Sequence, residues 1–404
     1  MQSTSRSADA AGHTGAPVSG HPAPVGAERR IIALDGIRGL MTILVVISHF
    51  FAELPGGLNV FAFGWIAVDM FFVLSGFLVG RLILEKGDRA NFFTVFYVRR
   101  VCRTFPIYFF CVLVLVALFS SMPPTISEAD VAFPTWSYLT FTQNFFMIAN
   151  DSIGAHWLAP TWTLAVEEQF YLFAPAVLLF TPRRFLLPVL VAVAAAAVVL
   201  RGSIFWFGYA PMAAYVLFPA KADILVCGLI AAVVLLQSRL DWKRYDDALR
   251  VAPIVLLVLV FAIRAIEGKG GIVFETTGHL LVSLASAAFL LAVVRGAPEG
   301  KRLTSNVLCF FGNTSYAVYL THLPILWLAH GLVFGAKPAL VSPLHWLVTL
   351  GAMLVVVPVG WALTRLVEEP ITAYGRRWKW SDEKRQTEHA SPVGLKQGLS
   401  SSVS

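Results

Sequence analysis

The sequence predicts an all-α polytopic membrane protein, a bundle of about ten transmembrane helices with both termini in the cytoplasm. Of its 404 residues, 57% are hydrophobic and only 14% are charged, which is not the composition of a soluble protein. The mean hydropathy is +0.72 although both ends of the chain are polar, so the part between them is almost continuously apolar. At about 20 residues per helical span, that part has room for roughly ten spans.

The spans follow from apolar runs that end at charged residues, proline or glycine. In chain order we predict them at roughly 31–53, 60–81, 101–121, 162–181, 185–201, 219–237, 251–267, 277–294, 306–331 and 344–367. The apolar stretch 204–219 is interrupted by Gly208, Pro211 and Pro219. It therefore fits an interfacial or re-entrant segment better than an eleventh span.

The basic residues predict the orientation of the bundle. With ten spans and a cytoplasmic N-terminus, 26 of the 31 Lys and Arg residues lie on the inside and five on the outside. This is a strong positive-inside signal. The longest outside connection, 121–161, has no Lys or Arg and is rich in aromatic residues, as expected for a loop folded over the outer mouth of the bundle.

The two ends and the cysteines complete the domain organisation. Residues 1–30 are rich in Ala, Gly, Ser and Pro and have no apolar core, which predicts a disordered cytoplasmic tail and not a signal peptide. Residues 31–370 form the transmembrane domain and 371–404 a polar cytoplasmic tail. The four cysteines have no paired spacing, which indicates buried thiols and neither disulfides nor a metal site. The composition also excludes a nucleic-acid binder and, because the apolar runs do not alternate, a porin-like barrel.

Polar residues inside the spans are the candidate functional residues, because they are costly in a bilayer. Arg38 and His49 are eleven residues apart in the first span, which places them on one helical face and about 16 Å apart along its axis. Arg38 then lies near the cytoplasmic surface and His49 in the outer half. The alternative is that Arg38 reaches the interface and His49 makes a structural hydrogen bond.

Asp69 in the second span lies at a depth similar to His49. A carboxylate there could accept a hydrogen bond from the imidazole and raise its basicity, as in acyl-transfer triads. Glu167 and Glu168 occupy the outer part of the fourth span, and neighbouring positions diverge by about 100°, so at most one faces the bundle centre. His322 lies in the ninth span. Asp69 and His322 could equally be structural.

Arg99, Arg100 and Arg103 precede the third span, with Arg100 and Arg103 on one helical face. Arginine forks at a helix N-terminus suit phosphate groups, so the cluster could bind a polyphosphate ligand or could simply anchor the topology. The sequence has no Walker A or Rossmann glycine pattern. A nucleotide-bearing ligand would then be held by side chains between helices.

Five motifs together resemble the membrane acyltransferase-3 family, whose members O-acylate carbohydrates. They are LDGIRGLMTILVVISHF (34–50), VDMFFVLSGFLVG (68–80), FYVRRVCRTFPIYF (96–109), WTLAVEEQFYLFAP (162–175) and SYAVYLTHLPI (315–325). Arg38 and His49 match the family's Arg-x10-His pattern, and Arg100 and Arg103 its Arg-x-x-Arg pattern. Lys221 departs from relatives that have arginine there. The chain ends about 35 residues after the last span, so it resembles the stand-alone form of the family.

The resemblance implies an acyl-CoA donor, most simply acetyl-CoA, on the cytoplasmic side and a carbohydrate or glycolipid hydroxyl on the outer side of a bacterial inner membrane. Together with the polar residues selected above, it leads us to expect catalysis by His49 with Asp69, Glu167, Glu168 and His322. We expect acyl-CoA binding by Arg38, Arg99, Arg100 and Arg103, of which the family patterns themselves match only Arg38, Arg100 and Arg103. No metal or permanently bound cofactor is expected. The rival hypotheses are a glycan transporter or flippase, whose buried ionisable groups would look alike, and an inactive scaffold.

Overall fold

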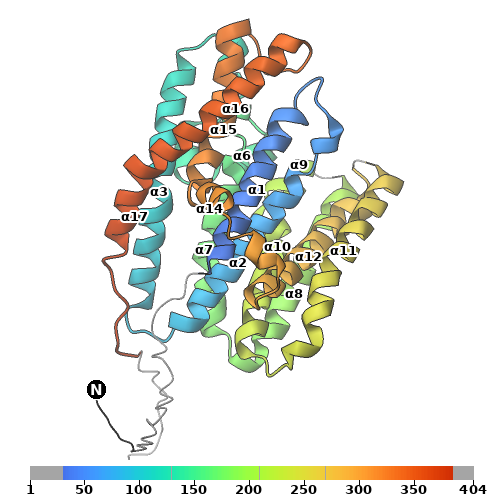
Figure 1. Cartoon of the computed structure of the whole chain (residues 1–404), viewed down its shortest axis with the longest axis vertical. Helices are drawn as coiled ribbons and strands as arrows, with labels where there is room; N and C mark the ends of the chain where they lie inside the picture. Colours follow the sequence, from blue (N-terminus) through green and yellow to red (C-terminus); the bar gives the residue numbers. More distant parts are fainter. Residues whose placement is uncertain (1–30, 129, 209, 269, 385–404) are drawn as a thin grey trace, which may run out of the picture. The chain divides into compact units, whose positions relative to one another are not determined.

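The computed structural model describes residues 31–128, 130–208, 210–268 and 270–384. These residues are mostly helical and contain no β-strand beyond an isolated bridge between Arg89 and Lys384. They include ten helical segments that are long and apolar enough to cross a membrane, which confirms the predicted fold class (Figure 1). The helices are α1 (Ile32–Phe51), η1 (Asn59–Phe61), α2 (Gly64–Lys86), α3 (Phe92–Ser120), α4 (Pro124–Ser127), α5 (Thr135–Leu139), α6 (Gln143–Ala149), η2 (His156–Leu158), α7 (Thr161–Phe180), α8 (Arg183–Phe207), α9 (Pro211–Val216), α10 (Phe218–Gln237), η3 (Trp242–Tyr245), α11 (Asp246–Glu267), η4 (Phe274–Gly278), α12 (His279–Val294), α13 (Glu299–Arg302), α14 (Asn306–Asn313), α15 (Ser315–Phe334), α16 (Pro343–Leu363), η5 (Thr364–Glu368) and α17 (Glu369–Gly375).

The ten segments correspond one to one with the ten predicted spans. The stretch 204–219 contains the end of α8, the six-residue helix α9 and the start of α10, so it adds no separate span. The predicted ninth span began too early, because 306–313 forms the separate helix α14 and the span itself is α15. The tenth continues through η5 and α17 to Gly375, beyond the predicted end at 367.

Glycines allow the central helices to approach closely. A Cβ atom on Gly39 of α1 would overlap the Leu308 carbonyl of α14, and one on Gly312 would overlap the Asp35 carbonyl. In the same way Gly76 of α2 lies against the Leu225 carbonyl of α10. Small residues at helix interfaces permit such backbone contact in membranes, where helix association depends on close packing. These contacts fix α1 and α2 at the centre of the bundle.

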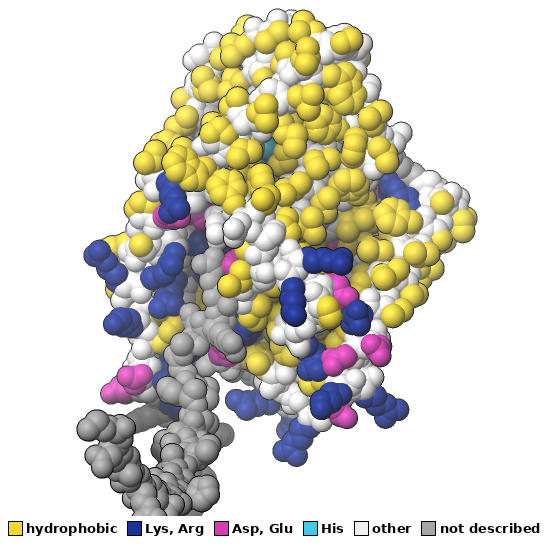
Figure 2. Space-filling view, in the orientation of Figure 1, with side chains coloured by type: hydrophobic (Ala, Val, Ile, Leu, Met, Phe, Trp, Pro, Cys, Tyr) yellow, Lys and Arg dark blue, Asp and Glu magenta, His cyan; other side chains and the backbone are white. Residues whose placement is uncertain are grey.

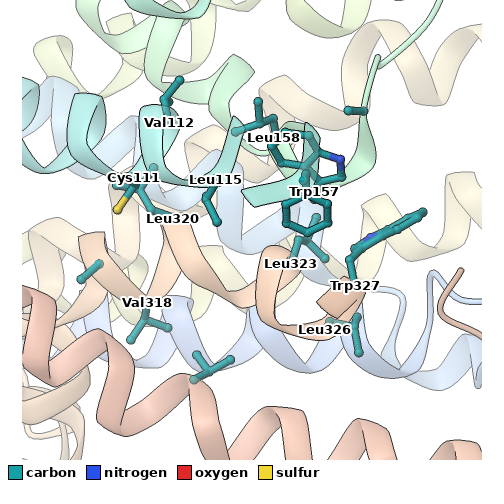
Figure 3. Close-up of a cluster of buried hydrophobic side chains, with 14 of the residues drawn as sticks. Cys111, Val112, Leu115, Trp157, Leu158, Val318, Leu320, Leu323, Leu326 and Trp327 are labelled. Atoms are coloured by element: carbon teal, nitrogen blue, oxygen red, sulfur yellow. The ribbon is translucent and has the colours of Figure 1, made fainter. Parts of the chain in front are cut away.

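A hydrophobic cluster joins α3, η2 and α15 (Figure 3). Leu115 of α3 and Leu323 of α15 are among its buried members, and both lie close to Trp157 in the view. The ring of Trp157 also stacks on Phe119, with centroids 4.2 Å apart and planes 7° apart. The cluster anchors η2, in the connection between α3 and α7, against α3 and α15.

The connection between α3 and α7 is held in place by hydrogen bonds. Buried Glu128, in the left-handed region at φ 51°, accepts hydrogen bonds from the His156 backbone N–H (2.7 Å), from His156 Nδ1 (3.0 Å) and from Lys337 Nζ (2.7 Å). Burial raises the pKa of the Glu128 carboxyl, but these donors outweigh burial and hold the pKa below its ordinary value. Further in, Gln143 Nε2 donates to the Thr161 carbonyl at 2.8 Å. The predicted covering loop is thus tied to α7 and to the α15–α16 connection.

The segment after α17 packs along the start of α3. Arg99 donates to the Trp378 carbonyl through Nε (3.1 Å) and Nη2 (2.9 Å), and Phe92 stacks on Trp380 with centroids 5.7 Å apart. We expected a polar tail over 371–404, and its described part, up to residue 384, is held against α3. The remainder of that tail and the expected tail 1–30 lie outside the described residues.

Charged and apolar side chains separate on the surface of the bundle. On the face shown in Figure 2, hydrophobic side chains cover the upper part, whereas Lys and Arg gather mainly over the lower half. All four cysteines lie among the described residues and are free thiols; Cys111 and Cys227 are buried and Cys102 and Cys309 are partly buried.

Candidate active site

Two histidines from the first and ninth spans form a contact pair inside the bundle. His49 Nδ1 of α1 lies 2.7 Å from His322 Nε2 of α15, and the two rings stack with centroids 5.0 Å apart. His322 is completely buried, and the side chain of His49 is 17% exposed. Both residues could be selected from the sequence, but nothing in it indicated that they touch.

The neighbours of this pair determine where its protons lie. His322 Nδ1 is 2.7 Å from the Tyr319 carbonyl, which can only accept, so His322 Nδ1 bears the proton. In the neutral ring, His322 Nε2 is then an acceptor, and His49 Nδ1–H donates to it. This leaves the lone pair of neutral His49 on Nε2. The Glu53 carboxylate lies 3.5 Å from that nitrogen, close enough to attract the ring once it is protonated.

A cavity of about 130 Å³ lies between the helices, and neither histidine of the pair is among its lining residues. Arg38, Arg100 and Arg103 line it together with Thr163 and Tyr319. The Tyr319 hydroxyl is 3.0 Å from Thr163 Oγ1, and its carbonyl holds His322. Tyr319 therefore connects the arginine-lined cavity to the histidine pair. The structure thus places three of the four predicted arginines around one space.

The cavity is also lined by one acidic residue of the predicted pair. Glu167 Oε1 accepts from Ser75 Oγ at 2.6 Å, and Glu167 Oε2 from the Tyr171 hydroxyl at 3.3 Å. The Arg100 guanidinium lies 4.1 Å from the centroid of the Tyr171 ring. Glu168 lines a second pocket, which opens beside α3 and α7. Glu167 thus lines the cavity with the arginines and Glu168 does not, as the divergence of neighbouring helical positions leads us to expect.

Arg99 does not line either described pocket. Its guanidinium binds the Trp378 carbonyl and lies 5.1 Å from the centroid of the Trp380 ring. Arg99 and Arg100 are adjacent on a helix, so their side chains diverge by about 100°. Arg99 therefore does not share a cavity with Arg38, Arg100 and Arg103, contrary to the expected grouping.

Asp69 has a different partner from the one we expected. Its Oδ2 lies 2.6 Å from Nδ1 of His279 on α12, and no hydrogen bond joins it to His49 among the described residues. Nε2 of His279 lies 3.3 Å from Lys221 Nζ of α10. The depth predicted for Asp69 was compatible with either histidine. The rotation of α2 decides between them, because Asp69 faces α12 and α10.

Several residues of this region were missed from the sequence. Glu53 and His279 lie outside the five motifs, Tyr319 lies within the fifth but was not selected, and Lys221 was set aside as a departure from the family pattern. The signal that could have selected His279 and Lys221 is an ionisable side chain within an apolar span. Among the described residues, no group of three or more His, Cys, Asp or Glu side chains has an arrangement that could hold a metal ion.

The comparisons with known proteins concern the family of the chain. The family model described as an acyltransferase domain, acyltransferase-3, matches residues 31–365. The chain belongs to the acyltransferase-3 family. It is accordingly an integral, multi-pass membrane protein with an acyltransferase domain.

Curated relatives are similar over the same region. A protein of Bacillus subtilis named putative peptidoglycan O-acetyltransferase YrhL is 28% identical over 75% of this chain and 49% of its own length. The peptidoglycan O-acetyltransferase OatA of Listeria monocytogenes is 25% identical over 74% of this chain and 50% of its own. A putative O-acetyltransferase of Staphylococcus aureus strain COL is 25% identical over 75% and 52%. The chain thus spans about half the length of these relatives. No solved structure matches the chain.

Proposed function

We propose that this acyltransferase moves an acyl group, most simply acetyl, from cytoplasmic acyl-CoA to a hydroxyl of a carbohydrate on the outer side of the membrane. The observation that supports the proposal best is a chain of hydrogen bonds, in which His49 donates to His322 and His322 donates to the Tyr319 carbonyl. This chain leaves the His49 Nε2 lone pair available. Names of the relatives favour a cell-wall carbohydrate as acceptor. The cytoplasmic position of both termini is part of the proposal.

The chemistry follows from the proton positions. His49 Nε2 accepts the proton of the acceptor hydroxyl while the hydroxyl oxygen attacks the thioester carbonyl carbon. The new C–O bond forms, the C–S bond breaks, and the departing thiolate takes the proton from His49. General-base assistance of this kind is worth about 100- to 10,000-fold in rate. The Glu53 carboxylate and the His322 Nε2 lone pair stabilise the imidazolium between the two transfers.

The arginines supply the donor site in this proposal. Arg38, Arg100 and Arg103 line one cavity, and Arg38 is also 3.2 Å from Asp35 Oδ1. Guanidinium groups bind phosphate oxygens through charge-assisted hydrogen bonds, so they suit the phosphates of an acyl-CoA. The cavity extends from them to Tyr319, beside the histidine pair. An acyl group carried through it would reach His49 from the arginine side.

The function is tested by following the thioester. Membranes that contain the protein are incubated with acetyl-CoA labelled on the acetyl group, and released CoA and labelled glycan are measured. We expect both, and we expect mass spectrometry of cell-wall glycans to show an acetyl ester that is lost on deletion of the gene. An intact thioester together with unchanged glycans would contradict the proposal and favour a transporter.

The sidedness is tested separately by single cysteines in a cysteine-free background. Exposed Ser305, before α14, should resist a membrane-impermeant thiol reagent in intact cells and react after the membrane is opened. Exposed Asp130, in the connection between α3 and α7, should react in intact cells. The opposite pattern would reverse the orientation and place the donor outside.

A further inference from the structure

The ring of Tyr215 in α9 is 44% exposed, yet its neighbours are polar and aromatic. Its centroid is 4.8 Å from that of the Trp162 ring. The carboxylates of Glu53, Asp69 and Glu275 act on it electrostatically, so all three lie in its neighbourhood. A side chain that faces only lipid would not have a buried ammonium group, that of Lys221, 5.5 Å from its ring centroid and three carboxylates within electrostatic range. The exposed part of this ring therefore belongs to a polar surface.

A chain of three buried ionisable side chains, one each from α2, α12 and α10, ends next to the Tyr215 ring. Asp69 of α2 accepts from His279 Nδ1, and Lys221 of α10 donates to His279 Nε2. Lys221 Nζ lies 5.5 Å from the Tyr215 ring centroid, within the range of a cation–π contact. The side chains of all three chain members are more than 90% buried. The chain thus holds an ammonium group against one side of a ring that is partly exposed.

The same surface reaches the histidine pair through Glu53. The Glu53 side chain is 56% exposed, and its Oε1 is 3.5 Å from His49 Nε2. A ligand that packs on Tyr215 and hydrogen-bonds nearby carboxylates would therefore lie beside the nitrogen that we assign as the base. Sugars have this combination, because their C–H faces pack on aromatic rings and their hydroxyl groups donate to carboxylates.

We propose that Tyr215 is the surface on which the acceptor carbohydrate packs, and that the Lys221–His279–Asp69 chain positions Tyr215 from behind. This assignment rests on the proposed function and adds the acceptor subsite to it. Glu53 directs a sugar hydroxyl toward His49, while the donor occupies the arginine-lined cavity on the other side of Tyr319.

The test measures acceptor and donor kinetics of the purified protein with acetyl-CoA and the disaccharide chitobiose. Tyr215→Ala should raise the KM for chitobiose about tenfold, because the packing surface is lost, and leave the KM for acetyl-CoA within twofold. Tyr215→Phe keeps the ring and should keep the KM for chitobiose. Tyr245→Ala is the matched control, since Tyr245 is 41% exposed but lies at the start of α11.

Lys221→Met and Lys221→Arg test the positioning chain. Lys221→Met should raise the KM for chitobiose several-fold with little change in kcat, and Lys221→Arg should largely restore it. Binding of chitobiose measured by calorimetry, without donor, separates this subsite from the transfer reaction. Weaker binding to the Tyr215→Ala protein than to Tyr215→Phe and Tyr245→Ala supports the subsite even if no acetyl is transferred. Equal binding by all three would overturn it, whether or not the transfer reaction is observed.

Discussion

The cluster of His49 with His322 and the cluster of His279 with Asp69 and Lys221 differ in how their hydrogen-bond chains end. His279 is engaged on both ring nitrogens, by the Asp69 carboxylate and the Lys221 ammonium, so no lone pair remains for chemistry. His49 is engaged on Nδ1 only by a neutral imidazole, whose own chain ends at the Tyr319 carbonyl. A carboxylate near a buried histidine therefore does not identify the base. A histidine whose two ring nitrogens both have partners, like His279, can position its neighbours, whereas one with a lone pair left on a nitrogen, like His49, can accept a proton.

The largest expected effect is at His49. His49→Ala should lower the rate of acyl transfer by about 100- to 10,000-fold, because the accepting nitrogen is removed. The measurement is labelled acetyl transfer per amount of protein in the membrane. His345→Ala is the control, because His345 hydrogen-bonds Ser342 at the start of α16 and stacks on Phe334, and it should leave the rate near that of the parent. Near-parental transfer by the His49 variant would show that another group is the base.

His322→Ala should lower kcat by roughly 100-fold. Without the His322 acceptor, His49 Nδ1–H loses the partner that fixes its tautomer, as happens when the orienting residue of a triad is altered. His322→Gln keeps an acceptor oxygen and should recover part of the loss. The pH profile of kcat separates an orienting role of His322 from a role as the base. Loss of the base would lower kcat at every pH. Identical loss in both variants would indicate that His322 does more than orient His49.

The arginines should divide into two groups. Arg100→Ala and Arg103→Ala should each weaken acyl-CoA binding about ten- to hundredfold, since a charge-assisted hydrogen bond is worth roughly 1.5 to 3 kcal/mol. Arg99→Ala is the internal control and should change binding less than threefold, because Arg99 binds the Trp378 carbonyl. Binding of acyl-CoA and of a short pantetheine thioester is compared. Equal losses for both ligands would mean that the arginines only anchor α3.

Asp69→Asn should have a small effect, with a few-fold rise in the KM for the acceptor and kcat within about threefold. An amide can still accept the hydrogen bond from His279 Nδ1 but removes the charge at the end of the chain. Steady-state kinetics with acceptor and donor varied separately measures the split. A loss of kcat comparable to that of His49→Ala would place Asp69 in the proton transfer and undo the contrast between the two clusters.

The smallest effect on activity is expected at Glu128, in the connection between α3 and α7, whose carboxylate is bound by His156 and Lys337. The pKa of the Glu128 carboxyl is lower in the folded protein than in the unfolded chain, so ionised Glu128 stabilises the fold above its unfolded pKa. That stabilisation is lost as the pH falls through the folded pKa, below about 4.5. Thermal unfolding in detergent from pH 7 to 3 should show this loss, and Glu128→Gln should reduce it. The same acid sensitivity in both proteins would assign it to other carboxylates.

The sequence by itself determined the membrane class, the number of spans and the candidate residues. Length and hydropathy of a helix reflect the thickness of the bilayer, which acts on each span separately. Four residues could likewise be selected from the sequence of their own helices alone, and all four line one cavity: Arg38, Arg100, Arg103 and Glu167. Polar residues in apolar runs are conspicuous without any knowledge of their neighbours.

Only the tertiary structure decided which of these residues meet. His49 and His322 are 273 positions apart, and their contact depends on α1 lying against α15 with both helices rotated toward each other. Asp69 is at a depth that suits His49, but α2 turns it to His279. Arg99 is next to Arg100 in sequence and packs against a C-terminal segment instead of the cavity. A helix's own sequence sets its depth, whereas its neighbours and its rotation are set by close packing between helices.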